Sequence, residues 1–300
     1  MQVKMFLREG RTTSGENAMV KRWMLVFGSA AVFACSTGAS AALMVADFND
    51  IAAGTLAGKG GGTGFSGTWT GSAGGTVVTG DLTSSLYNLS QDGTPQRFRN
   101  TNATGLRQNY RTPSTSPTGT VWFSFLARAE AAGDQAGLSI NAPTPTPFAT
   151  PGTSYAYLVG DTLNYRFGST DTAGIALAGA VDSTVLVVGQ ASINPTGADA
   201  IKLWINPDLV ANPNINAYTP VYSNTTEDWI NSISHIGVIG ARLQDATAGG
   251  GNVDNVRFSD GGGNPTQAYQ DVTGVPEPTA FLGLAAVGAL GLLRRARRKA

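Results

Sequence analysis

Few side chains in this chain of 300 residues are suited to acid–base or nucleophilic catalysis. His235 is the only histidine and Cys35 the only cysteine, so any Ser-His-Asp triad would have to be built around His235, and a site with several histidines cannot form. Glycoside hydrolysis needs two carboxyl groups about 5 to 9.5 Å apart, one of them with a raised pKa. Away from the chain ends, the glutamates are Glu130 and Glu227, far apart in the sequence. We therefore expect no catalytic residues.

The many glycines do not add a nucleotide site. The 39 glycines form no Gly-x-x-x-x-Gly-Lys-Ser/Thr loop and no dinucleotide fingerprint after a strand. We interpret them as turn and loop residues, and His235, which begins an apolar stretch, as a structural residue.

Aromatic rings in polar segments offer a different chemistry, the binding of sugars by ring faces together with hydrogen bonds from amides and carboxylates. We expect Trp69, Trp122 and Trp204 in the core. The other rings either contact a carbohydrate or anchor loops, and they lie in or beside polar loops: Tyr110, Tyr155, Tyr157, Tyr218, Tyr222 and Trp229.

The last 26 residues predict a targeting signal, which begins with Val275, Pro276, Glu277 and Pro278. The prolines hold the backbone extended. Residues 280–293 are apolar on every side, whereas a core helix of a soluble domain would show a polar face. As a helix they would reach about 21 Å, which is short for a bilayer core of about 30 Å. We expect a short transmembrane helix whose cytoplasmic side is marked by Arg294, Arg295, Arg297, Arg298 and Lys299.

In this order of a Pro-Glu-Pro tripeptide, an apolar run and a basic end, residues 275–299 resemble the PEP-CTERM sorting signal of Gram-negative bacteria. The resemblance implies that a membrane protease, exosortase, cuts near Pro-Glu-Pro and passes the body outward from a transient anchor in the inner membrane. It also implies a host that makes exopolysaccharide. It does not imply what the body does.

The N-terminus predicts a secretory signal. Lys21 and Arg22 precede an apolar stretch over 23–34, and Ala39 and Ala41 provide the small residues that signal peptidase needs. We expect 1–41 to be a leader and signal helix that is cut after Ala41 and handled by the general secretion machinery, with translation starting at Met1 or Met19. Cys35 loosely fits a lipoprotein acceptor as an alternative, and the mature body would otherwise have no cysteine and no disulfide.

Removing the two signals changes the charge of the chain. Ten of the 20 basic residues but only three of the 20 acidic ones lie in the terminal segments, which leaves a body with a net charge of −7. Such a body does not indicate nucleic-acid binding. We divide the rest into a β-sandwich domain at 42–260, a Gly/Pro linker at 261–274 and the sorting signal at 275–299.

The body is typical of β structure, because it is rich in glycine, threonine and asparagine and poor in helix formers. In 120–127 the alternate residues Val121, Phe123 and Phe125 share one face and Trp122 and Leu126 the other, so both faces are expected to be covered. Short β-branched or aromatic runs between turn residues predict the remaining strands at 43–48, around 65–69, 76–79, 86–89, 97–99, 183–189, 201–205, 235–242 and 252–258.

The succession of these strand segments resembles the concanavalin A-like, or laminin G-like, jelly-roll sandwiches. The resemblance implies an all-β fold of two antiparallel sheets in which the first and last strands are neighbours, so that Asp47 and Asp50 would lie near Asp254 and Asn255. These four residues are candidate calcium ligands, or else turn and cap residues; we expect no other cofactor. Relatives that cleave sugars carry Glu-x-Asp-x-x-Glu or Glu-x-Asp-x-Glu on one strand, and this chain has neither.

We therefore expect a non-catalytic, exported protein of the cell surface or extracellular matrix, sorted by exosortase and associated with exopolysaccharide and biofilm. The alternative is a lectin-like module, calcium-dependent if the aspartates bind the ion, and a glycoside hydrolase is the less favoured third reading.

Overall fold

The structure is a computed structural model of the whole chain, and it describes residues 43–89, 93–101, 106–145, 153–167, 171–226, 228, 230–242 and 249–275. The predicted signal helix and the predicted transmembrane helix lie outside these ranges. No helix of the described part is long and apolar enough to cross a membrane.

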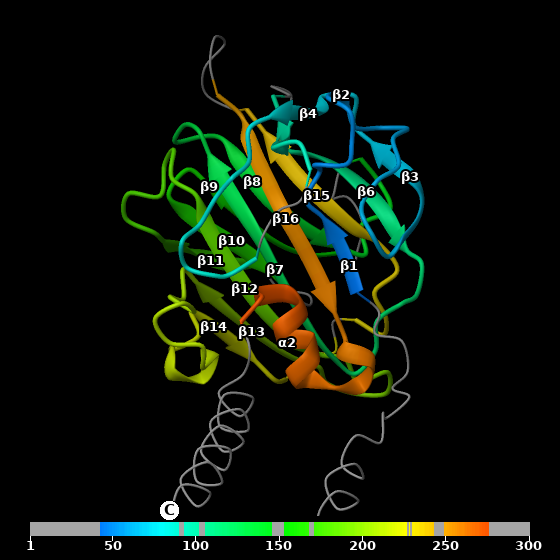
Figure 1. Cartoon of the computed structure of the whole chain (residues 1–300). Helices are drawn as coiled ribbons and strands as arrows, with labels where there is room; N and C mark the ends of the chain where they lie inside the picture. The colour runs from blue at the N-terminus through cyan, green and yellow to red at the C-terminus, as the bar shows by residue number, and fades with distance from the viewer. Residues whose placement is uncertain are drawn as a thin grey trace, which may run out of the picture. The chain divides into compact units, whose positions relative to one another are not determined.

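Two antiparallel sheets form the described body, which confirms the predicted two-sheet sandwich (Figure 1). Sheet A has nine strands, with β14-β13-β12-β7-β16-β5-β4-β2 in order and β1 beside β16. Its strands are β1 (Leu43–Ala46), β2 (Gly54–Thr55), β4 (Gly75–Thr79), β5 (Gln96–Asn100), β7 (Thr120–Ala129), β12 (Val185–Ser192), β13 (Ala200–Ile205), β14 (Tyr222–Asn224) and β16 (Gly251–Ser259).

Sheet B lies behind sheet A in Figure 1 and has seven strands in the order β11-β10-β9-β8-β15-β6-β3. Its strands are β3 (Phe65–Gly71), β6 (Arg107–Pro113), β8 (Gln135–Ile140), β9 (Ser154–Val159), β10 (Thr162–Arg166), β11 (Asp171–Ala176) and β15 (Ile236–Ala241). The sequence predicted only β3 and β15 among them.

The main core lies between the sheets, and a second apolar cluster lies on the outer face of sheet A. Strand β7 contributes to both, as its pattern predicted: Val121, Phe123 and Phe125 belong to the main core, and Trp122 and Leu126 to the outer cluster. Alternation along a strand sends neighbouring side chains to opposite faces, so a strand covered on both sides is apolar throughout. All three tryptophans expected in the core are buried.

The first and last strands are neighbours, as expected. Leu43 of β1 pairs with Ser259 of β16 and Ala46 with Val256. Strand β16 therefore lies among β1, β5 and β7, which places side chains from the two ends of the domain and from its middle on one face.

The structure corrects the linker predicted over 261–274. These residues form a 3-10 turn, η3 (Gly261–Gly263), and helix α2 (Pro265–Thr273), which packs on the outer face of sheet A (Figure 1). Asn264 caps the helix by accepting a hydrogen bond from Thr266 N, and Pro265 occupies the first turn. Gly274 ends it with a φ of 66°, a conformation that glycine adopts without strain.

A second correction concerns residues 86–89, which lie in a loop and not in a strand. Tyr87 is buried in the outer cluster, with Leu86 and Leu89 packed against it, and the 3-10 turn η2 (Ile215–Ala217) contributes Ile215. The apolar residues of this loop therefore cover sheet A beside α2.

Candidate functional site

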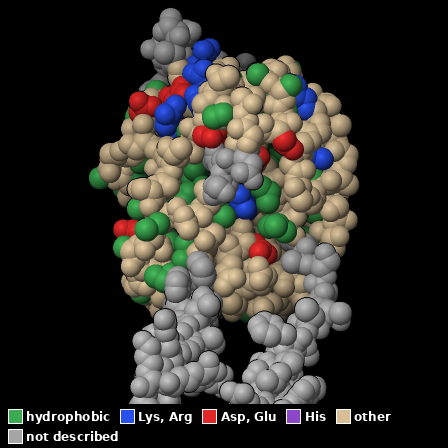
Figure 2. All heavy atoms as spheres, viewed as in Figure 1, with side chains coloured by type: hydrophobic (Ala, Val, Ile, Leu, Met, Phe, Trp, Pro, Cys, Tyr) green, Lys and Arg blue, Asp and Glu red, His purple; other side chains and the backbone are tan. Residues whose placement is uncertain are grey.

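The outer face of sheet A changes along β7 from a covered, mainly apolar surface to an exposed, charged one. Trp122, Ser124 and Leu126 lie under α2 and the loops, and two residues later Arg128 begins a charged surface. Figure 2 shows the densest group of charged side chains on this face over the ends of β7, β16 and β5. We call the residues in contact there the arginine cluster: Arg97, Arg99, Arg128, Glu130 and Asn252.

Strand register brings the cluster together. Asn252 of β16 pairs with Arg99 of β5 on one side and with Arg128 of β7 on the other. Arg99 in turn pairs with Thr76 of β4. The side chains face outward because their neighbours Phe98, Ala127 and Val253 belong to the main core.

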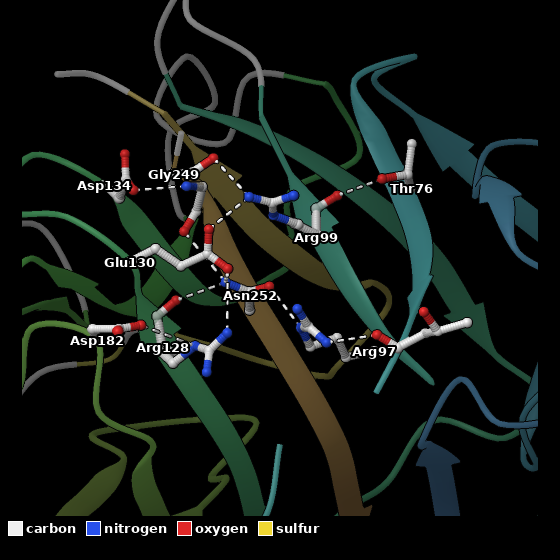
Figure 3. Close-up of polar contacts among 11 residues, drawn as sticks. Thr76, Arg97, Arg99, Arg128, Glu130, Asp134, Asp182, Gly249 and Asn252 are labelled. Atoms are coloured by element: carbon white, nitrogen blue, oxygen red, sulfur yellow. Dashed lines mark hydrogen bonds and ion pairs between the residues drawn. The ribbon is translucent and has the colours of Figure 1, made fainter. Parts of the chain in front are cut away.

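Glu130 is the centre of the network (Figure 3). Its Oε2 lies 2.6 Å from Arg99 Nη2, and its Oε1 lies 3.2 Å from Arg128 Nη2. Asn252 Nδ2 donates to the same Oε1 at 3.0 Å, and Asn252 Oδ1 accepts from Arg97 Nε at 2.8 Å. Three guanidinium groups thus gather about one carboxylate.

The electrostatics of the cluster keep Glu130 ionised. Burial alone would raise its pKa, but hydrogen bonds from Arg99 and Asn252, with the charge of Arg99 and a bond from Arg128, lower it below the ordinary value. Burial lowers the pKa of Arg97, and the charge of Arg128 adds to that effect. A carboxylate with a lowered pKa is a poor general acid at neutral pH.

The cluster also holds nearby backbone. Arg97 Nη1 donates to the carbonyls of Thr79 and Gly80, and Arg99 Nη2 donates to Gly249 O at 3.1 Å. Asp134 accepts from Gly250 N at 2.7 Å (Figure 3). These bonds fix Arg97 strongly, whereas Arg99 and Arg128 remain partly open, with 30% and 27% of the side chain exposed.

The outer face of sheet B carries a second polar surface. Register aligns Arg166, Tyr155, Ser139, Gly237 and Tyr110 across five strands, and we call them the tyrosine row. Tyr155 is buried and stands edge-on to the half-buried Tyr157, with ring centroids 5.4 Å apart.

The other residues predicted for chemistry lie apart from one another. His235 stands edge-on to Tyr110 at 5.7 Å, its Nδ1 meets Ser234 Oγ at 3.0 Å, and burial lowers its pKa, so it is neutral at pH 7. Tyr222 packs against Tyr165, and Tyr218 contacts the outer cluster. Glu227 and Trp229 lie outside the described residues.

The candidate calcium ligands are neighbours whose oxygens accept protein donors. Asp254 accepts from Leu82 N and Asn255 N, and Asn255 Oδ1 accepts from Arg257 Nε. Asp50 accepts from Gly62 N, and Asp47 accepts from Asn49 N. In the part of the chain that the structure describes, no group of three or more His, Cys, Asp or Glu residues is arranged to hold a metal ion.

A hollow of about 230 Å³ opens beside Asp254, which accepts from Leu82 N in its lining. Burial raises the pKa of Asp81, and the nearby charge of Asp47 adds to the rise. The hollow is lined by Asp81, Leu82, Thr83, Ser84, Tyr87 and Leu89.

The end of the chain matches a known family. Residues 274–299 match the PEP-CTERM protein-sorting motif, which confirms the predicted signal and covers Pro276, Glu277, Pro278 and the basic end. The motif implies export, processing by an exosortase and sorting to the cell surface. No curated protein matches the chain.

Several solved structures are similar to the body. The endo-β-1,4-glucuronan lyase of the fungus Trichoderma reesei is 14% identical, with 69% of this chain and 92% of that chain covered and a TM-score of 0.41. The β-glucanase of Bacillus licheniformis is 12% identical, with 69% and 97% covered and a TM-score of 0.38. The carbohydrate-binding module CBM66 of Bacillus subtilis is 12% identical, with 61% and 93% covered and a TM-score of 0.33.

Proposed function

We propose that this chain is a non-catalytic protein of the cell surface or extracellular matrix, which exosortase releases from the inner membrane of a Gram-negative cell into its exopolysaccharide. The observation that carries the proposal is the match of residues 274–299 to the PEP-CTERM sorting motif. The sorting motif begins at Gly274, directly after α2 ends at Thr273, and Val275 is still buried. The described body therefore continues up to the residues at which the sorting motif begins.

The short segment between α2 and the predicted transmembrane helix supports a transient anchor. Residues 276–279 span at most about 14 Å when extended, so the body stays close to the membrane until the chain is cut. The non-catalytic role is supported by Glu130, the one glutamate among the described residues. It is bound by two arginines, which keep it ionised.

Cell fractionation tests the sorting part of the proposal. Replacing Pro276, Glu277 and Pro278 together by alanine is expected to leave the full-length chain in the inner membrane, whereas the wild-type body is found shortened outside it. Gln267→Ala, an exposed helix residue outside the motif, is the control and should behave as the wild type. Export and shortening of the triple variant at the wild-type level would contradict the proposal.

A second candidate function is a lectin-like module that uses the tyrosine row for neutral sugars. Its support is the half-buried Tyr110 beside His235 and the loop from Ala142 to Pro145, whose carbonyls accept from Gln108 and which borders the row. Tyr110→Ala is expected to abolish binding to neutral members of a glycan array. The absence of any neutral glycan that binds the wild type would remove this candidate.

A further inference from the structure

The arginine cluster concentrates positive charge on an acidic body. Three of the body's ten basic residues meet there around the single carboxylate of Glu130, while the body as a whole carries −7. Asp182 lies 3.7 Å from Arg128 Nε, but 69% of its side chain is exposed, so solvent weakens this pair. With Glu130 and Asp182 both counted, the three arginines leave an excess of about one positive charge at neutral pH.

We propose that the arginine cluster is a binding site for an acidic polysaccharide, whose carboxylate groups pair with Arg99 and Arg128. The proposal rests on the proposed extracellular function and names the class of polysaccharide that the protein contacts.

Among the described residues, both guanidinium groups keep donors that make no hydrogen bond and that suit a carboxylate. Arg99 and Arg128 each reach Glu130 through Nη2, and no hydrogen bond of either Nη1 is found among the described residues. A guanidinium fork binds a carboxylate through two parallel hydrogen bonds, which the single Nη2 contact of Arg128 leaves possible for a further anion. Arg99 Nη2 already donates to Glu130 and to Gly249 O, so Arg99 offers a ligand its Nη1. Partial exposure of both side chains keeps them within reach of a ligand.

The spacing of the two arginines suits a chain with repeated charges. They flank Asn252 on adjacent strands, so their backbones are two strand spacings, or about 10 Å, apart. The row continues to Thr76 on β4, and the Asn252 amide lies between the charges as a neutral hydrogen-bonding group. The central strands hold these groups without any loop movement.

Another explanation is that the cluster only ties β5, β7 and β16 together. The two explanations differ for Glu130→Gln. A ligand site gains from this change, because the competing carboxylate is gone and the arginines remain. A purely structural network gains nothing and only loses stability.

The test is binding of the purified full-length chain to polygalacturonate, a carboxylated polymer, and to dextran, a neutral one, at low and high salt. The wild type is expected to bind polygalacturonate and to lose it as salt rises. Arg99→Gln with Arg128→Gln should weaken binding at least about tenfold, since charge-assisted bonds are lost, and Glu130→Gln should strengthen it. Lys202→Gln with Arg242→Gln removes equal charge elsewhere and should bind as the wild type.

Melting curves show which variants are folded, and Arg128→Gln alone replaces the double variant if that one does not fold. Wild-type affinity in the Arg99/Arg128 variant, equal binding of the two polymers, or weaker binding by folded Glu130→Gln would overturn the proposal. These outcomes do not depend on sorting, which the fractionation experiment tests separately.

Discussion

Helix α2 should be an integral part of the fold, and Tyr269 is the residue that tests this most sharply. Its side chain is only 1% exposed and meets Trp122 edge-on, with ring centroids 5.0 Å apart. Its hydroxyl donates to Pro213 O at 2.8 Å, which ties the helix to the loop before η2. Tyr269→Ala removes the ring and this hydrogen bond together.

Replacing a buried aromatic residue by alanine costs about 3–5 kcal/mol. For a domain of this size that lowers the melting temperature by on the order of 10 °C. Tyr269→Phe keeps the ring and loses only the hydrogen bond, so it should cost about 1 kcal/mol. Thermal and urea unfolding of the purified protein measure both variants, and Gln267→Ala on the exposed side of α2 should change the free energy by less than about 0.5 kcal/mol.

The order of the melting temperatures of the three variants shows whether α2 stabilises the body. If Tyr269→Ala melts within a degree or two of Gln267→Ala, α2 does not contribute to the stability of the body, and the predicted linker over 261–274 would describe these residues better.

Three further predictions follow from single contacts. Glu130→Gln should lower the free energy of unfolding by about 1.5–3 kcal/mol at pH 7. Because the folded-state pKa of Glu130 lies below its ordinary 4.5, the stability that ionised Glu130 contributes is present above the unfolded pKa and is lost as the pH falls through the folded pKa. Urea unfolding of the wild type and the variant should therefore give the same stability in acid. Adding calcium to chelator-treated protein should leave the melting temperature unchanged, because the oxygens of Asp254 accept from Leu82 N and Asn255 N, and a rise would reveal a site. Asn264→Ala should cost about 1 kcal/mol, measured by urea unfolding, through loss of the α2 cap, and no loss would mean that the cap is not needed.

The strands of sheet A were largely predictable from the sequence, whereas most of sheet B was not. Strands β7 and β12 are covered on both faces and are therefore continuously apolar. Strand β6 instead buries Gln108 and Asn109, whose side-chain nitrogens donate to loop carbonyls. Only the folded chain brings those carbonyls into place, so the sequence of β6 reads as a polar loop.

The sequence contains residues that mark the start and end of helix α2, but the glycines around them favoured the prediction of a linker. Asn264 and Pro265 form a cap and a first turn, Gly274 forms the end, and Tyr269 and Val272 lie on one face between them. Its nine residues are too few to form a stable helix alone, so packing on sheet A stabilises it.

The arginine cluster was predictable only in part. The alternation of Arg97 and Arg99 around Phe98 places both arginines on one face of a predicted strand. Their meeting with Arg128 and Asn252 depends on strand register between segments more than a hundred residues apart, which local patterns do not specify.

The mass of the intact exported protein tests the central claim most directly. Exosortase processing predicts a chain that ends near Pro276–Pro278 and retains α2, without the basic residues from Arg294 to Lys299. A secreted protein whose mass includes Lys299 would contradict the account.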